Sequence, residues 1–341
     1  IPKGSLYMNP KIYTGTGSSN AITGVGFQPD WTWIKRRNGT NGHNLYDVIR
    51  GVTKTINSAT TAAESTSGSG LTAFGTDGFT VVSDGDVNAS GGTYASWNWL
   101  ANGTGSANTA GSINSTVSAN TTSGFSIVSY TGNGGSTPKT VGHGLGVAPK
   151  MIIIKPTNLT YDWMTYNENV GATKGMCLNT TQAPFTSSNF NDTAPTTSVF
   201  SVKNNATNET NGTYIAYCFA DVQGFSKMGS YTGNANANGP FVYTGFKPSF
   251  VIIKRTNLAN DWLTQDNKRY PINETVAKTL KPNSALAEGD TGNLDILSNG
   301  FKLRSTGTNT NASGGTYIYM AFAENPFVAT SGTSAIPVTA R

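Results

Sequence analysis

Hydrophobic residues in this chain occur in short runs of about four to eight positions, separated by segments rich in glycine, asparagine and proline. Some runs alternate with polar residues, as in 78–82, and others are apolar throughout, as in 151–154. Alternation is typical of a half-buried strand, and a short continuous run is typical of a strand buried on both faces. Helical periodicity is weak, and we expect at most one or two turns within 45–63 and 276–280. The pattern predicts an all-β protein.

Five short phrases recur three times in the same order. Each copy opens with Tyr-Thr-Gly, then joins a glycine turn and a proline to an apolar strand ending in lysine. An aspartate follows after a loop, then a strand that carries a Phe, with Gly before it in two of the copies, and finally Gly-Thr-Tyr with an aromatic strand. Pro29 and Pro149 are 120 positions apart, and so are Gly92 and Gly212. Such matching offsets indicate a true internal repeat.

Each copy has about 100 residues, which is the size of a domain and larger than a solenoid repeat. We therefore predict three tandem β-sandwich or jelly-roll-like domains, each able to fold alone. The expected boundaries are repeat 1 over 1–106, a linker over 107–123, repeat 2 over 124–224, repeat 3 over 225–327 and a C-terminal tail over 328–341.

Composition narrows the class of protein further. Only 12% of the residues are charged, against about 25% in typical soluble proteins. The 36% hydrophobic and 10% aromatic content argues against disorder. The net charge of +5 is spread along the chain, without the clustered basic face of a nucleic-acid binder. No apolar run reaches the ~20 residues of a membrane span. We expect neither nucleic acid nor membrane as a partner.

Few residues are candidates for chemistry. His43 lies in what we interpret as an exposed loop, and His143 in a glycine-rich turn that leads into a strand, whereas a phosphate-binding loop leads into a helix. Asp84 and Asp86 could form a carboxylate pair or a calcium site, but their role as turn residues beside Gly85 is the plainer account. We therefore predict no catalytic residue, no metal and no cofactor. Cys177 and Cys218 are too few for a disulfide scaffold or a zinc site, and whether they are bonded stays open.

The recurrent polar positions are the better candidates for a shared role, as ligand-binding residues. They are the strand-end lysines and the aspartates after the loop, with two adjacent tryptophans: Lys35, Asp47, Lys155, Asp162, Trp163, Lys254, Asp261 and Trp262. In one interpretation each lysine and aspartate form an ion pair or cap a turn. In the other, the aspartate and the tryptophan form a sugar-binding platform.

Several phrases resemble a family of virion structural proteins of tailed bacteriophages, largely from marine and cyanobacterial hosts. The resemblance spans nearly the whole chain and is carried by residues 23–30, 33–35, 45–47, 50–51, 141–153 and 321–327. Proteins of this family are described as tail-fibre-like or structural. The resemblance implies a place on the exterior of the virion and supplies no catalytic residues.

Three functions are compatible with these observations. The first is a tail fibre or receptor-binding protein, non-enzymatic and trimeric, that contacts host surface polysaccharide. The second is a capsid decoration or head-fibre protein that binds other virion proteins. The third is a cellular carbohydrate-binding module or adhesin. Low charge and repeated compact β domains fit all three.

Overall fold

The computed structural model describes residues 3–134, 137–269 and 278–326, and it confirms the all-β prediction. The described helices are a single 3-10 turn, η1 (Gly4–Leu6), and two short α-helices, α1 (Gly85–Asn88) and α2 (Asn205–Asn208). The segment 45–63, where helical turns were possible, instead contains two strands. The predicted tail at 328–341 lies outside the described residues.

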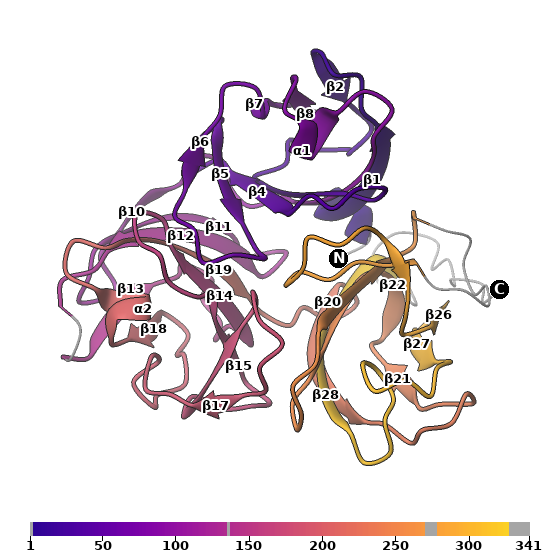
Figure 1. Ribbon diagram of the computed structural model, residues 1–341. Coiled ribbons are helices and arrows are strands. Elements are labelled where there is room, and N and C mark those ends of the chain that lie inside the picture. Colours follow the sequence, from indigo (N-terminus) through magenta and orange to yellow (C-terminus); the bar gives the residue numbers. More distant parts are fainter. Residues whose placement is uncertain (1–2, 135–136, 270–277, 327–341) are drawn as a thin grey trace, which may run out of the picture.

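Each repeat forms one unit with a large sheet and a small sheet (Figure 1). Unit 1 comprises residues 3–105. Its large sheet has the order β1 (Met8–Thr14), β9 (Thr93–Trp99), β3 (Trp31–Arg36), β4 (His43–Asp47), β5 (Lys54–Asn57), β6 (Ser65–Thr66). Its small sheet has the order β2 (Asn20–Ile22), β8 (Gly78–Val81), β7 (Leu71–Gly75). The two sheets enclose a cluster of buried residues that includes Ile34 and Phe79.

Unit 2, residues 106–224, repeats this arrangement with two more strands in the large sheet and one fewer in the small sheet. Its large sheet has the order β10 (Ser106–Asn108), β11 (Ser115–Asn120), β12 (Phe125–Thr131), β19 (Thr213–Phe219), β14 (Met151–Pro156), β15 (Met164–Asn167), β16 (Lys174–Cys177), β17 (Phe185–Thr186). Its small sheet pairs β13 (Lys139–Gly142) with β18 (Val199–Val202). The segment 107–123, expected to be a linker, contains β11 and most of β10. It adds to the sheet because Ser115 and Val117 face inward while β11 pairs with β12.

Unit 3, residues 225–326, completes the repeat. Its large sheet has the order β20 (Ser226–Thr232), β28 (Thr316–Pro326), β22 (Phe246–Arg255), β23 (Trp262–Asp266). A three-stranded small sheet has the order β21 (Phe241–Tyr243), β27 (Gly300–Leu303), β26 (Leu294–Leu297), and a two-stranded sheet pairs β24 (Lys278–Thr279) with β25 (Gly289–Asp290).

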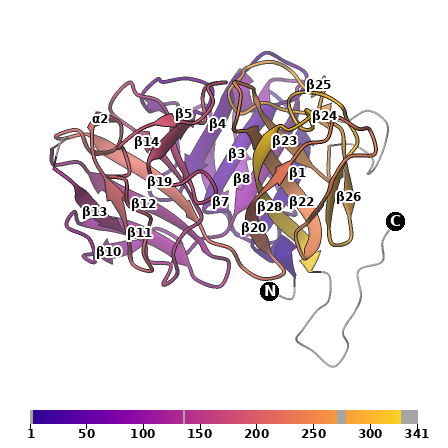
Figure 2. The ribbon, with the colours of Figure 1, turned by 90° about the horizontal axis from the view of Figure 1, so that it is seen from below.

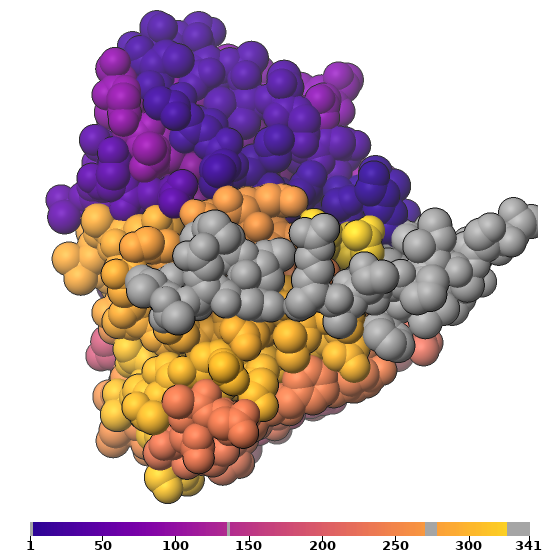
Figure 3. Space-filling view, turned by 90° about the vertical axis from the view of Figure 1, so that its right-hand side faces the viewer, coloured from indigo at the N-terminus to yellow at the C-terminus, as the bar shows by residue number. Residues whose placement is uncertain are grey.

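The three large sheets turn one face toward a common centre, so that the units form a closed ring (Figures 1 and 2). One continuous hydrophobic cluster at this centre takes residues from all three units. Trp99 of unit 1 lies 5.7 Å from Phe322 of unit 3, and Phe322 lies 5.9 Å from Phe219 of unit 2, between ring centroids. Figure 3 shows units 1 and 3 packed against each other along a broad boundary.

This shared centre explains the continuous apolar runs in the sequence. The central strands β3, β14 and β22 are buried on both faces, because one face covers the small sheet and the other meets the neighbouring units. That each repeat folds alone stays a prediction, and the shared hydrophobic cluster counts against it. A separated unit would expose its inward face, including Trp31 or Phe250, to water.

Candidate functional site

The three recurrent lysines lie at the ends of the equivalent strands β3, β14 and β22, and none of their side chains is exposed. Each ammonium group donates to a backbone carbonyl of a different unit. The distances are Lys35 Nζ to Ala285 O 3.1 Å, Lys155 Nζ to Thr61 O 2.9 Å and Lys254 Nζ to Thr181 O 2.8 Å. Unit 1 thus binds unit 3, unit 2 binds unit 1 and unit 3 binds unit 2. The same contact is used three times around the ring.

These lysines interact with carbonyl groups within their own units as well. Lys155 Nζ donates to the carbonyl of Tyr161 at 2.9 Å, and Lys254 Nζ donates to that of Asn260. Burial lowers the pKa of each of the three lysines to about 8, since the charged form loses its hydration. The expected lysine–aspartate ion pairs are not formed, because carbonyl oxygens surround each ammonium group instead.

Trp163 and Trp262 occupy the position opposite these lysines and are fully buried between units. The indole Nε1 of Trp163 donates to the Asn57 carbonyl of unit 1 at 3.0 Å, and that of Trp262 donates to the Cys177 carbonyl of unit 2 at 3.0 Å. Neither ring has a face available for a sugar. The platform interpretation of these two tryptophans therefore has no support from their position.

His43 is the unit-1 counterpart of these tryptophans, and the interpretation of it as an exposed loop residue is wrong. His43, in β4, pairs with Lys35, in β3, as Trp262 pairs with Lys254 in unit 3. Its side chain is completely buried. Its Nδ1 accepts a hydrogen bond from Trp33 Nε1 at 2.8 Å, so the ring proton lies on Nε2, beside the backbone of Lys281. Burial holds the pKa of His43 well below its usual value. The sequence did not reveal this equivalence because unit 1 has a histidine where units 2 and 3 have a tryptophan.

Asp47 is not the equivalent of Asp162 and Asp261. It pairs with Trp31 at the other end of β4, and this position is occupied by Asn167 in unit 2 and Asp266 in unit 3. The sequence comparison aligned Asp47 to the wrong aspartates because it used the adjacency of an aromatic residue. The spacing Asp-x-x-Arg, present as Asp47–Arg50 and Asp266–Arg269, is the signal that identifies the true counterparts.

Asp47 and Asp266 each anchor a buried contact between units. Asp47 Oδ2 accepts from Arg50 Nε at 2.6 Å and from the hydroxyl of Tyr217, in unit 2, at 2.8 Å. Asp266 Oδ2 accepts from Arg269 Nε at 2.5 Å and from Trp97 Nε1, in unit 1, at 2.9 Å.

At the boundary between units 2 and 3, the described residues include no such charged pair. There Asn167 replaces the aspartate, Val170 stands where the other units have arginine, and Met320 replaces Tyr217 and Trp97. The amide Nδ2 of Asn167 has no hydrogen-bond partner among the described residues. The same fold therefore forms one interface without the ionic group.

Asp162 and Asp261 fix the loops that precede β15 and β23. Asp162 Oδ1 accepts from Asn179 Nδ2 at 2.7 Å, and Asp261 Oδ1 accepts from Asn283 Nδ2 at 2.8 Å. The side chain of Asp261 also lies 2.7 Å from Lys281 Nζ. Hydrogen bonds from Asn283 and Lys281 lower the pKa of Asp261, although its partial burial opposes this. Their contacts give these aspartates a structural role.

The remaining candidates have structural partners too. His143 is buried, with Nε2 3.1 Å from the Thr196 carbonyl. Asp84 Oδ1 caps α1 by accepting from the backbone N–H of Asp86. Cys177 and Cys218 are buried, unbonded thiols. Among the described residues, no three His, Cys, Asp or Glu side chains are grouped as a metal site would require. No helix within the same residues has the length and apolarity to cross a membrane.

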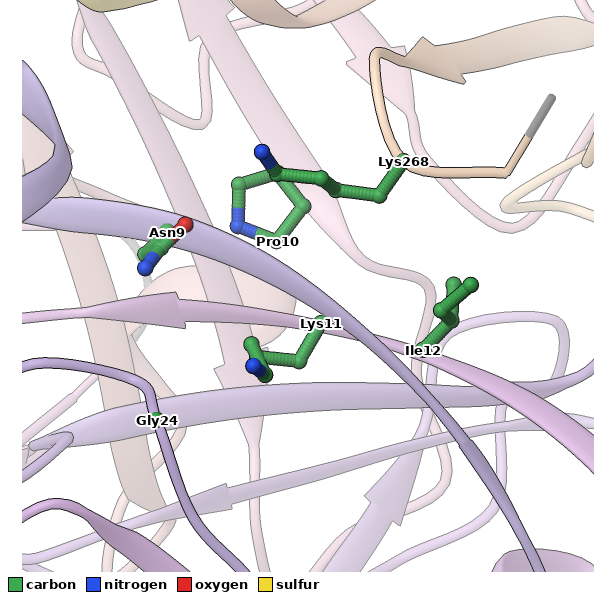
Figure 4. Close-up of a pocket in the computed structure, with 6 residues that line it drawn as sticks. All are labelled: Asn9, Pro10, Lys11, Ile12, Gly24 and Lys268. Carbon is green, nitrogen blue, oxygen red and sulfur yellow. The ribbon is translucent and has the colours of Figure 1, made fainter. Parts of the chain in front are cut away.

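A pocket of about 290 Å³ opens between units 1 and 3, along the outer edge of β1 (Figure 4). It is lined by Asn9, Pro10, Lys11, Ile12, Gly24 and Lys268. The lining contains two lysines and no carboxylate, thiol, hydroxyl or imidazole side chain.

Comparison with known proteins gives one match. A family model described as a domain of unknown function (DUF7483) matches residues 3–326, which includes all three units. No curated protein and no solved structure is significantly similar to the chain.

Proposed function

The chain belongs to the DUF7483 family, and on that premise we propose that it is a non-enzymatic structural protein on the exterior of a bacteriophage particle. Its first role in this proposal is that of a tail fibre or receptor-binding protein that contacts host surface polysaccharide. The phrases that resemble phage virion proteins support this assignment, and they lie in the strands and loops that build the ring.

The observation that carries the non-enzymatic part is the location of the recurrent polar residues. The ammonium groups of Lys35, Lys155 and Lys254 donate hydrogen bonds to carbonyl groups of neighbouring units. Asp47 and Asp266 are buried and each forms an ion pair with an arginine. The recurrence that could have marked three equivalent active sites is explained by assembly of the ring. A function that depends on shape and surface contacts fits this architecture better than catalysis does.

A second candidate, a capsid decoration or head-fibre protein, is favoured by the symmetry of the ring. Three similar units around one centre approximate three-fold symmetry within a single chain. Homo-oligomeric proteins commonly have closed point-group symmetry, three-fold rings among them. A single chain of this kind suits a three-fold position on a capsid without needing two further copies.

Cryo-electron microscopy of the particle that carries this chain tests the proposal. Density at the distal end of the tail supports receptor binding, and density at three-fold positions of the capsid lattice supports decoration. Absence of the chain from purified particles, checked by mass spectrometry, would refute both roles. The third function, a cellular adhesin, would then be the one to pursue.

A further inference from the structure

The small sheet of unit 3 exposes two aromatic side chains on the outside of the ring. β21 has alternating exposure, with Val242 buried and its two neighbours directed outward. Phe241 is 45% exposed and Tyr243 is 62% exposed. Figure 1 places β21, β27 and β26 on the outer side of unit 3, away from the shared centre. These rings therefore contribute little to the core.

Charged side chains lie beside the aromatic rings on the same face. The strand register puts Phe241, Lys302 and Asp295 in one row across the three strands. Asp295 also forms an ion pair with Arg304, with 3.2 Å between Oδ2 and Nε. In the next row Tyr243 pairs with Gly300. We define the outer patch as Phe241, Tyr243, Asp295, Lys302 and Arg304.

The other two units show that the fold does not need aromatic residues here. Val242 pairs with Phe301 as Ile22 pairs with Phe79 in unit 1 and Val141 with Phe200 in unit 2. By this register the position of Phe241 is occupied by Ala21 and Thr140, and that of Tyr243 by Thr23 and Gly142. The three units share one fold, so the fold itself does not require aromatic rings at these two positions.

Each aromatic ring lies close to a glycine, Phe241 to Gly300 in β27 and Tyr243 to Gly245 in the bend before β22. A β-carbon at Gly300 would lie 3.0 Å from Cε2 of Phe241, and one at Gly245 would lie 3.5 Å from the hydroxyl oxygen of Tyr243. Residues two apart on one strand face are about 7 Å apart. The strand thus presents two aromatic rings in sequence beside hydrogen-bonding side chains.

We propose that the outer patch binds a saccharide, with one sugar ring stacked on Phe241 or Tyr243 and its hydroxyl groups bonded by Asp295, Lys302 and Arg304. Sugars combine an apolar C–H face with hydroxyl groups, and the patch combines aromatic surface with charged donors and acceptors. A stable protein partner would instead need about 800 Å² of complementary surface on each side, far more than two rings supply. This inference deepens the attachment role proposed above and rests on it for its biological meaning.

Binding of the purified full-length chain to immobilised bacterial lipopolysaccharides and capsular polysaccharides tests the inference. The test variant is F241A/Y243T, which installs the residues that unit 1 carries at these positions. L258A is the control, because Leu258 is 51% exposed on a different part of unit 3. We expect the wild type and L258A to bind at least one polysaccharide. We expect the test variant to lose on the order of tenfold or more in affinity, as for a truncated aromatic anchor.

Two results would overturn the inference: no polysaccharide bound by the wild type, or equal binding by the wild type and F241A/Y243T. F241L/Y243L provides a second variant if the first fails to fold, since leucine keeps apolar volume but has no flat ring. Binding by the isolated chain and location on the particle are separate measurements. The failure of one can therefore be distinguished from the failure of the other.

Discussion

Asp266 offers the sharpest test of how the ring is held together. Its carboxylate accepts four hydrogen bonds: from Arg269 Nε at 2.5 Å, Trp97 Nε1 at 2.9 Å, and the backbone N–H groups of Lys268 at 3.0 Å and Arg269 at 3.1 Å. Asp266 is 3% exposed and Arg269 is 4% exposed. The substitution D266N keeps the size of the side chain but removes the charge that Arg269 faces.

The structure permits an estimate of the cost. Removing one partner of a buried ion pair typically costs about 3–5 kcal/mol, because the other charge is left buried without compensation. Glu288 lies 3.1 Å from Arg269 Nη1 and remains as a counter-ion, so we expect a value near the lower limit, about 3 kcal/mol. Asparagine has a single acceptor oxygen, so either the two backbone N–H groups or the Trp97 and Arg269 side chains would face its NH2 group and lose their acceptor.

The boundary between units 2 and 3 supplies a matched control. There the chain already uses Asn167 and Val170 in place of the aspartate and the arginine. D266N/R269V reproduces this pair at the boundary between units 1 and 3 and leaves no buried charge of the pair unmatched. Trp97, where unit 3 has Met320, keeps its indole N–H at this boundary. Replacing a buried ion pair by uncharged residues is often close to neutral, so we expect the double variant to lose less stability than D266N alone.

Urea unfolding followed by tryptophan fluorescence measures these differences, since all six tryptophans are buried in the folded chain. The single variants D266N and R269V complete a double-mutant cycle, which isolates the coupling between the two residues. The reasoning would be refuted if the loss in the double variant equalled the sum of the two single losses. That result would mean that the two side chains act independently.

Three further predictions follow from the ring and its buried groups. A chain truncated after residue 224 should bind a hydrophobic dye and self-associate, because the loss of unit 3 uncovers the shared centre; a monomeric truncation with cooperative unfolding would contradict this. Raising the pH from 8 to 9 should increase the free energy of unfolding. Each recurrent lysine has a pKa of about 8 in the folded chain, against 10.5 for the ordinary side chain. The folded chain therefore binds fewer protons than the unfolded chain in this pH range, so stability rises with pH. The increase should be smaller in K155M. An unchanged free energy of unfolding from urea titrations at the two pH values would count against the buried ammonium groups. H43W alone should lower the free energy of unfolding by about 1–3 kcal/mol, because the larger ring overpacks the site. W33I/H43W copies Ile153 and Trp163 of unit 2 and should cost less than about 1.5 kcal/mol, as measured by calorimetry. Equal losses would refute the equivalence of His43 with the tryptophans.

The recurrent phrases of the sequence determined much of this architecture. The runs that begin after Pro29 and Pro149 became the central strands β3 and β14, and the Gly-Thr-Tyr phrases lead into β9, β19 and β28. Alternation, turn residues and offsets are local properties of the chain, so they can be identified without knowing what each strand packs against. The three-fold repetition and the all-β class follow from them.

Only the tertiary structure decided what the buried faces touch. The pattern of Met151–Pro156 indicates a strand covered on both sides, but a second sheet of the same domain and a neighbouring unit bury it equally well. The contact between Lys155 and Thr61, and that between Asp266 and Trp97, join residues about 94 and 169 positions apart. The charges of the recurrent lysines and aspartates suggested an exposed site, because charged side chains are almost never buried unless paired. The ring supplies those partners from other units, and no local pattern in the chain records which unit lies opposite which.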